Sequence, residues 1–485
     1  MTIDQNQCYE AVRTRDARFD GRFYSAVLTT GIYCRPICPA RTPRRQNMVY
    51  FRSAAACEEA GFRACRRCRP EASPGTPAWM GTSGTVSRGL KLIGEGFLDE
   101  LTVDDLAVKL GMGSRHLRRL FTEHLGASPK AVATTRRAHF AKQLIESTNL
   151  SMTNIAYSSG FSSVRRFNAA IKKSFDRIPS EIRKHNASRT SRLATAAIEL
   201  RLPFRSPFDW TSLLGFLKDR ATPRVEFITD NRYHRTIEIN GRTGTISVER
   251  CAETNKLLLK VDYPDPRELL GIVERVRKLF DLAADPDQIE DAIRNDPFMV
   301  PRVKRFPGLR VPGAWDGFEL SVRAILGQQV SVKGATTLAG RLAETFGRVI
   351  EHSDTEQLSR VFPAPDKIAE ADIASIGLPK QRADAIRALA RNVADGDICF
   401  EYVSDTLEFH NSLTAVPGIG AWTANYIAMR TICDPDAFPA DDLVLRKVLS
   451  RNGKPLTTKQ ISKQSKRWQP WRAYAAMYLW RTSGD

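Results

Sequence analysis

Long apolar runs are absent from this sequence of 485 residues. No run approaches the roughly 20 consecutive apolar residues that a membrane-spanning helix needs. The N-terminus, MTIDQNQCYEAVRTRDARF, also lacks the apolar centre of a secretory signal peptide. We therefore expect a cytoplasmic protein that has no membrane partner.

A single hydrophobic core is also excluded, because cores stop growing beyond roughly 250–300 residues. The contents of 42% hydrophobic and 26% charged residues are ordinary for a globular protein, so two to four domains are expected. A stretch rich in Pro, Gly, Ser and Thr at 71–85 predicts a linker, and ASRTSR at 187–192 predicts a second joint.

Acidic residues are scarce in two segments. Residues 31–70 contain nine Arg and two Glu, and residues 106–190 contain sixteen Lys or Arg and four acids. These balances of +7 and +12 account for the whole net charge of +19. A localised basic excess is typical of proteins that bind the phosphate backbone of nucleic acids. A merely solubilising surface is the alternative.

Cysteine is unevenly placed, since five of the nine lie between Cys34 and Cys68. In a cytosolic protein, clustered cysteines indicate metal or redox chemistry rather than disulfides. Two close pairs separated by a loop can close a tetrahedral site of four sulfurs around Zn²⁺. The expected ligands are Cys34, Cys38, Cys65 and Cys68. A purely structural zinc is the alternative for a generic site of this kind. The four thiolates give the site a negative charge, which nearby arginines, including Arg35, Arg66 and Arg67, would offset.

An internal repeat of about 50 residues follows, in which 106–130 is similar to 155–180. The two copies align Ser114 with Ser163 and Leu117 with Phe167. The second copy has one extra residue, placed between Ser163 and Phe167. Each copy has a helical pattern, a Gly-containing turn, a second helical pattern and a Pro, which is the layout of a helix-turn-helix. The second helices, at about 113–123 and 162–173, are expected to enter the major groove of DNA. The candidate contacts are Ser114, Arg115, Arg118, Ser163, Arg165, Arg166 and Asn168.

The segments TTGIYCRPICPAR (29–41) and GFRACRRCRPE (61–71) resemble the N-terminal domain of the Ada family of adaptive-response regulators. The repeat resembles the AraC-type DNA-binding domain that follows it there. The resemblance implies that Cys34 is both a zinc ligand and the acceptor of a methyl group from a DNA methylphosphotriester. It also implies a transcriptional regulator whose partners are promoter DNA and RNA polymerase.

Alternating segments between 195 and about 275 predict antiparallel strands, and helical patterns return from about 266. Within LTAVPGIGAWTANY (413–426), Gly418 and Gly420 predict the tight turn of a helix-hairpin-helix, whose backbone amides can face a phosphate. Asp442 stands twenty residues after Trp422, in a region with an excess of aromatic residues. Plain core packing is the alternative for most of these aromatics.

These features resemble the AlkA family of helix-hairpin-helix 3-methyladenine DNA glycosylases over about 203–481. The resemblance includes PFDWTSLLGFLKDR (207–220), PGAWDGFELSVRAILGQQVSV (312–332) and RWQPWRAYAAMYLW (467–480). It implies that Asp442 is catalytic and that Phe216, Trp422, Tyr426 and Trp480 line the base pocket. Gln329 stands where that family has a Leu wedge, and Leu443 stands where it has a Tyr.

Bifunctional relatives carry a Lys two residues after the second hairpin Gly, where this chain has Trp422. We therefore expect a monofunctional glycosylase that removes alkylated bases, joined to a methyl-accepting regulator. Two other hypotheses are compatible with the sequence. One is a regulator with an inactive glycosylase-like DNA clamp, and the other is a constitutive glycosylase whose N-terminal half only tethers it to DNA.

The expected fold is multidomain and mainly α. It comprises a small zinc-bound α/β domain at 1–75, an all-α duplicated helix-turn-helix domain at 86–188, an antiparallel β/α domain at 195–285 and an all-α helix-hairpin-helix domain at 286–485.

Overall fold

The computed structural model describes residues 4–73, 84–186, 197–350, 355–450 and 455–483. Most of the predicted linker at 71–85, and the whole predicted joint at 187–192, lie outside the described residues. Within the described residues, none of the helices has the length and apolar character needed to cross a membrane.

The cysteine-rich segment forms a small sheet flanked by helices α1 (Gln5–Thr14) and α2 (Ala54–Glu59). The strand order is β3-β1-β2-β4, in which β1 pairs antiparallel with β2 and β3, and β2 pairs parallel with β4. The sheet is small because its strands are only two to four residues long. The strands are β1 (Tyr24–Val27), β2 (Ile32–Cys34), β3 (Met48–Phe51) and β4 (Arg63–Ala64).

Residues 84–186 are helical, and the long helix α7 (Pro129–Ser147) joins the two copies of the repeat. Helices α3 (Gly84–Gly94) and α4 (Phe97–Glu100) precede the first copy, whose two helices are α5 (Val103–Lys109) and α6 (Ser114–Leu125). The second copy contains α8 (Met152–Ser158), α9 (Val164–Phe175) and α10 (Pro179–Asn186). The predicted duplicated helix-turn-helix is confirmed.

The alignment of the two copies needs a correction. Gly113 is the N-cap of α6, whereas Ser163 is the N-cap of α9 and accepts a hydrogen bond from the backbone of Arg166. Ser163 therefore corresponds to Gly113 rather than to Ser114, and the inserted residue precedes Ser163 instead of following it. A capping serine is favoured there because its hydroxyl satisfies a free amide at the start of the helix.

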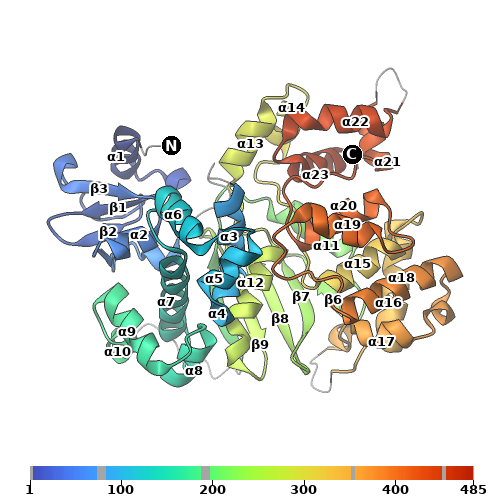
Figure 1. The fold of residues 1–485 in the computed structure, drawn as a ribbon, viewed down its shortest axis with the longest axis horizontal. Helices are drawn as coiled ribbons and strands as arrows, with labels where there is room; N and C mark the ends of the chain where they lie inside the picture. The colour runs from blue at the N-terminus through green and yellow to red at the C-terminus, as the bar shows by residue number, and fades with distance from the viewer. Residues whose placement is uncertain (1–3, 74–83, 187–196, 351–354, 451–454, 484–485) are drawn as a thin grey trace.

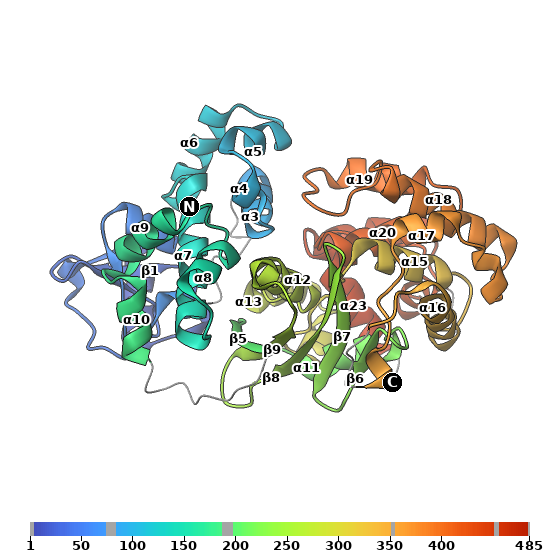
Figure 2. The same ribbon diagram turned by 90° about the horizontal axis from the view of Figure 1, so that it is seen from below.

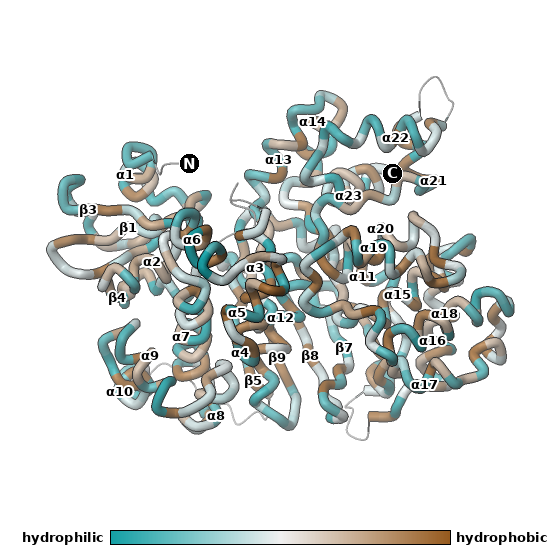
Figure 3. The backbone as a smooth tube through the Cα atoms, viewed as in Figure 1, coloured by the Kyte–Doolittle hydropathy of each residue, from teal (hydrophilic) through white to brown (hydrophobic). Residues whose placement is uncertain are grey.

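The next segment forms an antiparallel sheet of order β5-β9-β8-β7-β6, as the alternating sequence predicts. Along β8, apolar and polar residues alternate, so the tube in Figure 3 changes between hydrophobic and hydrophilic colours. Helices α11 (Trp210–Asp219) and α12 (Leu269–Leu279) accompany this sheet. The strands are β5 (Ile198–Pro203), β6 (Glu226–Ile228), β7 (Arg232–Ile239), β8 (Arg242–Arg250) and β9 (Lys256–Asp262).

The C-terminal part is helical and contains the predicted hairpin, formed by α19 (Thr406–Thr414) and α20 (Ala421–Thr431). Gly418 in the turn has φ +89°, and a Cβ there would lie 2.7 Å from the Cβ of Ala385, so two constraints require glycine. The other helices are α13 (Pro286–Arg294), α14 (Val300–Arg305), α15 (Gly317–Leu326), α16 (Val332–Phe346), α17 (Pro365–Glu370), α18 (Lys380–Ala394), α21 (Leu443–Val448), α22 (Thr458–Ser465) and α23 (Arg472–Thr482).

The two halves of the chain lie side by side and are in contact (Figure 1). The ring of Tyr402, in the loop before α19, packs edge-on against Phe97 of α4 at 5.2 Å and joins the hydrophobic core of the first repeat copy. Lys278 of α12 forms an ion pair with Glu95 at 2.8 Å. In Figure 2, α6 and α19 project to the same side of the molecule.

Candidate zinc centre and aromatic pocket

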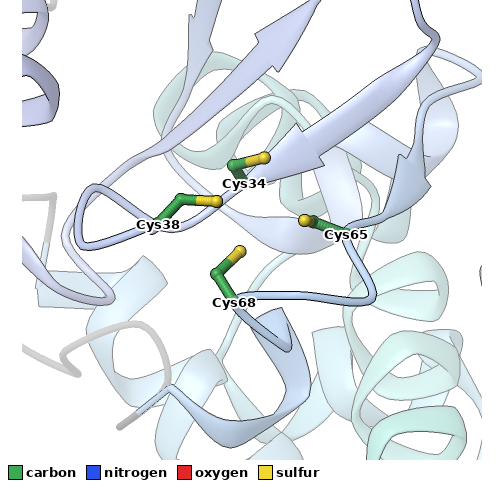
Figure 4. A group of neighbouring side chains, drawn as sticks. All are labelled: Cys34, Cys38, Cys65 and Cys68. Carbon is green, nitrogen blue, oxygen red and sulfur yellow. The ribbon is translucent and has the colours of Figure 1, made fainter. Parts of the chain in front are cut away.

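The four predicted cysteine ligands converge on one point. Cys34 ends β2, Cys38 lies in the following loop, Cys65 follows β4, and Cys68 lies one turn further on. Their sulfur atoms all lie within 4.8 Å of one another, and the side chains point inward (Figure 4). Four sulfurs at about 2.3 Å from one Zn²⁺ would lie roughly 3.8 Å apart, so the cluster fits a tetrahedral thiolate site.

The four cysteines differ in their exposure. Cys38, Cys65 and Cys68 are buried, whereas Cys34 is half-buried. The backbone N–H of Arg35 donates to Sγ of Cys68 at 3.3 Å, and its guanidinium is paired with Asp20. The same guanidinium also donates to the carbonyl of Cys68 at 3.2 Å, so the Arg35 side chain lies beside the cluster as well as beside Asp20, and its offset of the cluster's negative charge stays a prediction.

The second helices of the repeat present the expected basic faces. Arg115 and Arg118 on α6, and Arg165, Arg166 and Asn168 on α9, are exposed. Leu117 and Phe167 are fully buried, as expected of core positions. Ser114 and Ser163 are half-buried at the helix starts, and the capping role of Ser163 already engages its hydroxyl.

Asp442 is the N-cap of α21 and lies at the centre of a fixed set of donors. The indole N–H of Trp422 donates to Oδ2, and the indole N–H of Trp480 donates to Oδ1, each at 3.0 Å. The backbone amides of Val444 and Leu445 also donate to Oδ1, at 2.9 and 3.0 Å. These donors fix the orientation of the carboxylate while leaving it partly exposed.

Aromatic rings surround this carboxylate. Trp422 and Tyr426, one turn apart on α20, are stacked at 5.4 Å with an interplanar angle of 6°. Trp480 is tilted at 60° to Tyr426, 6.3 Å away. Phe216 on α11 packs against the hydrophobic core of the C-terminal helices, as Tyr426 and Trp480 do. The rings predicted to line a base pocket thus come from α11, α20 and α23.

Two arginines lie over the rings of Phe216 and Tyr426, and sequence reasoning missed both of them. The guanidinium of Arg430 lies 5.1 Å from the centre of Phe216 and 5.5 Å from that of Tyr426. Arg220 covers Phe216 at 3.8 Å. Burial alone would raise the pKa of Tyr426, but the positive charges of Arg430 and Arg220 outweigh burial and lower that pKa. In the sequence, the only sign of the contact between Arg430 and Tyr426 is their spacing of one helical turn on α20.

The hairpin is braced from the loop after α15. Gln328 donates through Nε2 to the carbonyl of Gly418 at 2.9 Å and to Oγ1 of Thr423 at 3.0 Å. Its neighbour Gln329 is exposed and has φ +55°, in the left-handed region. Gly420, at the other end of the hairpin turn, is exposed and is the N-cap of α20. Leu443, beside Asp442, is 67% exposed and does not close the pocket.

Comparison with known proteins assigns a family model to each part of the chain. The matches are the metal binding domain of Ada over 7–71, a helix-turn-helix domain over 106–185, the AlkA N-terminal domain over 199–316 and the HhH-GPD superfamily of base excision DNA repair proteins over 322–471. With the geometry of the four sulfurs, the first match identifies the cysteine cluster as a Zn²⁺ site.

Two curated relatives and one solved structure illustrate the likeness. A probable bifunctional transcriptional activator/DNA repair enzyme AlkA of Mycobacterium tuberculosis (strain CDC 1551 / Oshkosh) is 41% identical over 484 residues, covering 99% of this chain and 97% of its own. The DNA-3-methyladenine glycosylase 2 of Escherichia coli (strain K12) is 33% identical, covering 58% of this chain and 97% of its own. A 3-methyladenine DNA-glycosylase from Archaeoglobus fulgidus shares the fold, with a TM-score of 0.52 and 21% identity, over 58% of this chain and 98% of its own.

The fold and the matched domains define a class, that of multidomain DNA repair proteins with a zinc module, a helix-turn-helix region and a helix-hairpin-helix glycosylase fold. Within this class, the chain belongs to the family of bifunctional transcriptional activator/DNA repair enzymes of the AlkA type.

Proposed function

We propose that the C-terminal half hydrolyses the N-glycosidic bond of alkylated bases, of the 3-methyladenine type, in double-stranded DNA. The observation that carries this proposal is the position of Asp442, whose carboxylate is held by the indole N–H groups of two pocket rings, Trp422 and Trp480. An inactive DNA clamp would not need a partly exposed carboxylate fixed in this way beside an aromatic pocket.

The chemistry follows from this arrangement. Alkylation at purine N3 or N7 makes the base cationic and a good leaving group, and aromatic faces attract a cation by about 0.5–2 kcal/mol. Arginine guanidinium groups already cover Phe216 and Tyr426, so the indoles of Trp422 and Trp480 supply this attraction. After the base is flipped from the duplex, Asp442 stabilises the oxocarbenium-like sugar and orients the attacking water.

Base release from methylated duplex DNA by wild type and by Asp442→Asn tests this proposal. The variant should lose at least about a hundredfold in the single-turnover rate, because it lacks the charge felt in the transition state and one of the two oxygens that accept from the indoles. Its duplex affinity should stay nearly unchanged, because the proposed role of this charge lies in the transition state rather than in binding. A variant that excises bases at nearly the wild-type rate would refute the assignment of Asp442.

The glycosylase is proposed to be monofunctional. Trp422 occupies the position where bifunctional relatives carry a Lys, and an indole has no amine to attack the sugar. Water is then the nucleophile, and nothing drives strand cleavage by β-elimination. Sodium borohydride should trap no covalent protein–DNA adduct during turnover, and a trapped adduct would refute this part of the proposal.

We infer a second activity for the N-terminal half, in which Cys34 accepts a methyl group from a DNA methylphosphotriester. Cys34 is the one half-buried residue among the four ligands, which favours it as the cysteine that DNA reaches. Zn²⁺ keeps its coordinated thiols deprotonated. The Cys34 sulfur forms a bond to the methyl carbon while the methyl C–O bond breaks, and an anionic phosphodiester leaves.

Peptide mass spectrometry after exposure to methylphosphotriester DNA tests this activity. The methyl group should appear on Cys34, and its appearance on Cys38, Cys65 or Cys68 alone would refute the assignment. A thioether has no formal charge, so methylation makes the cluster less negative and should tighten DNA binding, an effect that salt weakens.

The regulator is proposed to act on promoter DNA through α6 and α9, whose exposed side chains would contact the major groove and phosphates. Gly418, Gly420 and Gln329 are proposed to contact DNA at the glycosylase end. RNA polymerase is the further partner that a promoter-bound regulator of this kind would meet, in the cytoplasm beside the chromosome. A glycosylase that its first half only tethers to DNA would take no methyl group on Cys34.

A further inference from the structure

Glu58 occupies an unusual position between the zinc module and the helix-turn-helix region. It lies near the end of α2, is only 8% exposed, and its carboxylate has partners on three other elements. Oε1 accepts from the Tyr33 hydroxyl at 2.9 Å and lies 3.3 Å from Nε2 of His139. Oε2 accepts from Thr135 at 3.0 Å and from Ser174 at 2.9 Å.

One end of this network leads directly to the zinc ligands. Tyr33 is fully buried and immediately precedes Cys34 on β2. Its carbonyl accepts a hydrogen bond from the backbone N–H of Cys65 at 3.0 Å. A displacement of the backbone at Cys34 is therefore transmitted to the Tyr33 hydroxyl, which is bonded to Glu58.

The other end leads to both second helices of the repeat. Ser174 lies in the last turn of α9. Ser53, the N-cap of α2, donates to the carbonyl of Leu125, the last residue of α6, at 3.0 Å. Glu59 accepts from the hydroxyl of Ser128, the N-cap of α7, at 3.1 Å. Helix α2 thus touches the ends of α6 and α9 together.

We propose that α2 transmits the state of Cys34 to both second helices of the repeat, to α9 through the carboxylate of Glu58 and to α6 through Ser53. Glu58 is a positioning residue in this scheme, and the scheme rests on the proposed methyl transfer to Cys34. A buried carboxylate that loses its partners is strongly destabilising, so β2, α7 and α9 keep their bonds to Glu58 and shift together. The network then supplies a mechanical path from the methyl acceptor to DNA affinity, in addition to the change in charge.

The experiment uses the full, zinc-loaded chain and a duplex that the methylated wild type has selected from random sequences. Its affinity is measured before and after methylation, and mass spectrometry counts the methyl groups on Cys34. Tyr33→Phe removes only the hydroxyl that joins β2 to Glu58. Tyr24→Phe is the matched control, because Tyr24 is also a buried tyrosine of this sheet, and its hydroxyl bonds Ser73 at 2.8 Å.

Wild type and Tyr24→Phe should gain about tenfold or more in affinity on methylation, within the usual range of allosteric coupling. Tyr33→Phe should be methylated equally and gain less than about twofold. A Tyr33→Phe variant that keeps the wild-type gain would show that charge alone carries the signal, and loss of the gain in both variants would show a general packing defect. Either result overturns the proposal.

A second variant acts from the far end of the network. Ser174→Ala leaves β2 untouched and should also lose the gain, which decides the matter if Tyr33→Phe takes up no methyl group. Methylated wild type without any gain would refute both the relay and the proposed regulation. A wild-type Cys34 that receives no methyl group would instead refute the proposed acceptor.

Discussion

Asp442 and Glu58 are two carboxylates with four hydrogen-bond partners each, one in each half of the molecule. The partners of Asp442 come from its own glycosylase half, and two of them are rings of the pocket. The partners of Glu58 come from the zinc module and from two helices of the neighbouring region, and its side chain is buried.

The difference lies in exposure and in the origin of the partners. Asp442 is partly exposed, as its proposed action on a bound sugar requires, and it is bonded to the indoles of Trp422 and Trp480. Glu58 has no such access and holds three elements together. The same degree of hydrogen bonding therefore leaves one carboxylate accessible, as the chemistry proposed for Asp442 requires, and encloses the other between three elements.

Zinc removal should produce the largest difference between the two halves of the molecule. Without the ion, four sulfurs within 4.8 Å of one another lose the charge that holds them together. Structural zinc contributes about 10–16 kcal/mol in small domains, so β2 and α2 should lose their protection from hydrogen exchange on chelation. Helices α20 and α23, and the rate of base release, should change little. Equal loss of protection in both halves would show that they fold as a single cooperative unit.

Trp480→Phe should test the Asp442 region next. The variant keeps an aromatic ring but removes one donor to the carboxylate, and a hydrogen bond to a charged group contributes about 1.5–3 kcal/mol. The single-turnover rate of base release should fall by roughly 10- to 150-fold. Trp468→Phe is the control, because its indole donates to Asp296 at 2.8 Å in the core. That control should lower stability without slowing excision, and an equal rate loss would point to general disruption.

The sequence predicts the zinc site well because its chemistry requires one residue type at a particular spacing. Four cysteines at ligand spacing, and a hairpin followed by Asp442 and tryptophans, admit few alternatives. Alternation predicts the antiparallel strands of the second sheet, but the pairing of β5 with β9 could not be predicted, because these strands lie far apart in the chain. The rings of Trp422, Tyr426 and Trp480 lie together beside Asp442, and their binding of a base stays a prediction.

Glu58 shows what could not be predicted. In the sequence it is one of two adjacent glutamates in a short helix, and its partners Tyr33, Thr135 and Ser174 are scattered over 142 positions of the chain. Nothing local distinguishes it from the neighbouring Glu59. The packing of Tyr402 against the core of the first helices of the repeat region also could not be predicted, because it depends on the contact between the two halves.

Glu58→Gln should cost more stability than Asp442→Asn. Glutamine retains only one acceptor oxygen in a buried network, so we expect a loss of about 1–3 kcal/mol in the N-terminal half. Asp442 is partly solvated, and its change to Asn should cost less than about 1 kcal/mol. The temperature at which bound zinc is released on heating, followed with a coloured chelator, reports the first effect. The comparison between the two carboxylates fails if Asp442→Asn lowers this temperature as much as Glu58→Gln does.

Gln329 and Gln328 repeat this contrast on a smaller scale. Gln328 braces the hairpin, whereas Gln329 is exposed and is proposed to fill the gap that a flipped base leaves. Gln329→Ala keeps a non-glycine residue at φ +55°, so the backbone strain is nearly unchanged and the side chain alone is tested. Affinity for a duplex with an abasic-site analogue should fall about fivefold, because unpairing costs a few kcal/mol that the side chain partly offsets. Single-turnover excision at saturating enzyme should fall less than about twofold.

Gln328→Ala should instead weaken the binding of intact and abasic duplexes equally, since it loosens the hairpin itself. An equal loss of affinity and rate in Gln329→Ala would mean that this side chain acts in the transition state, and the division between positioning and chemistry would not hold at this loop.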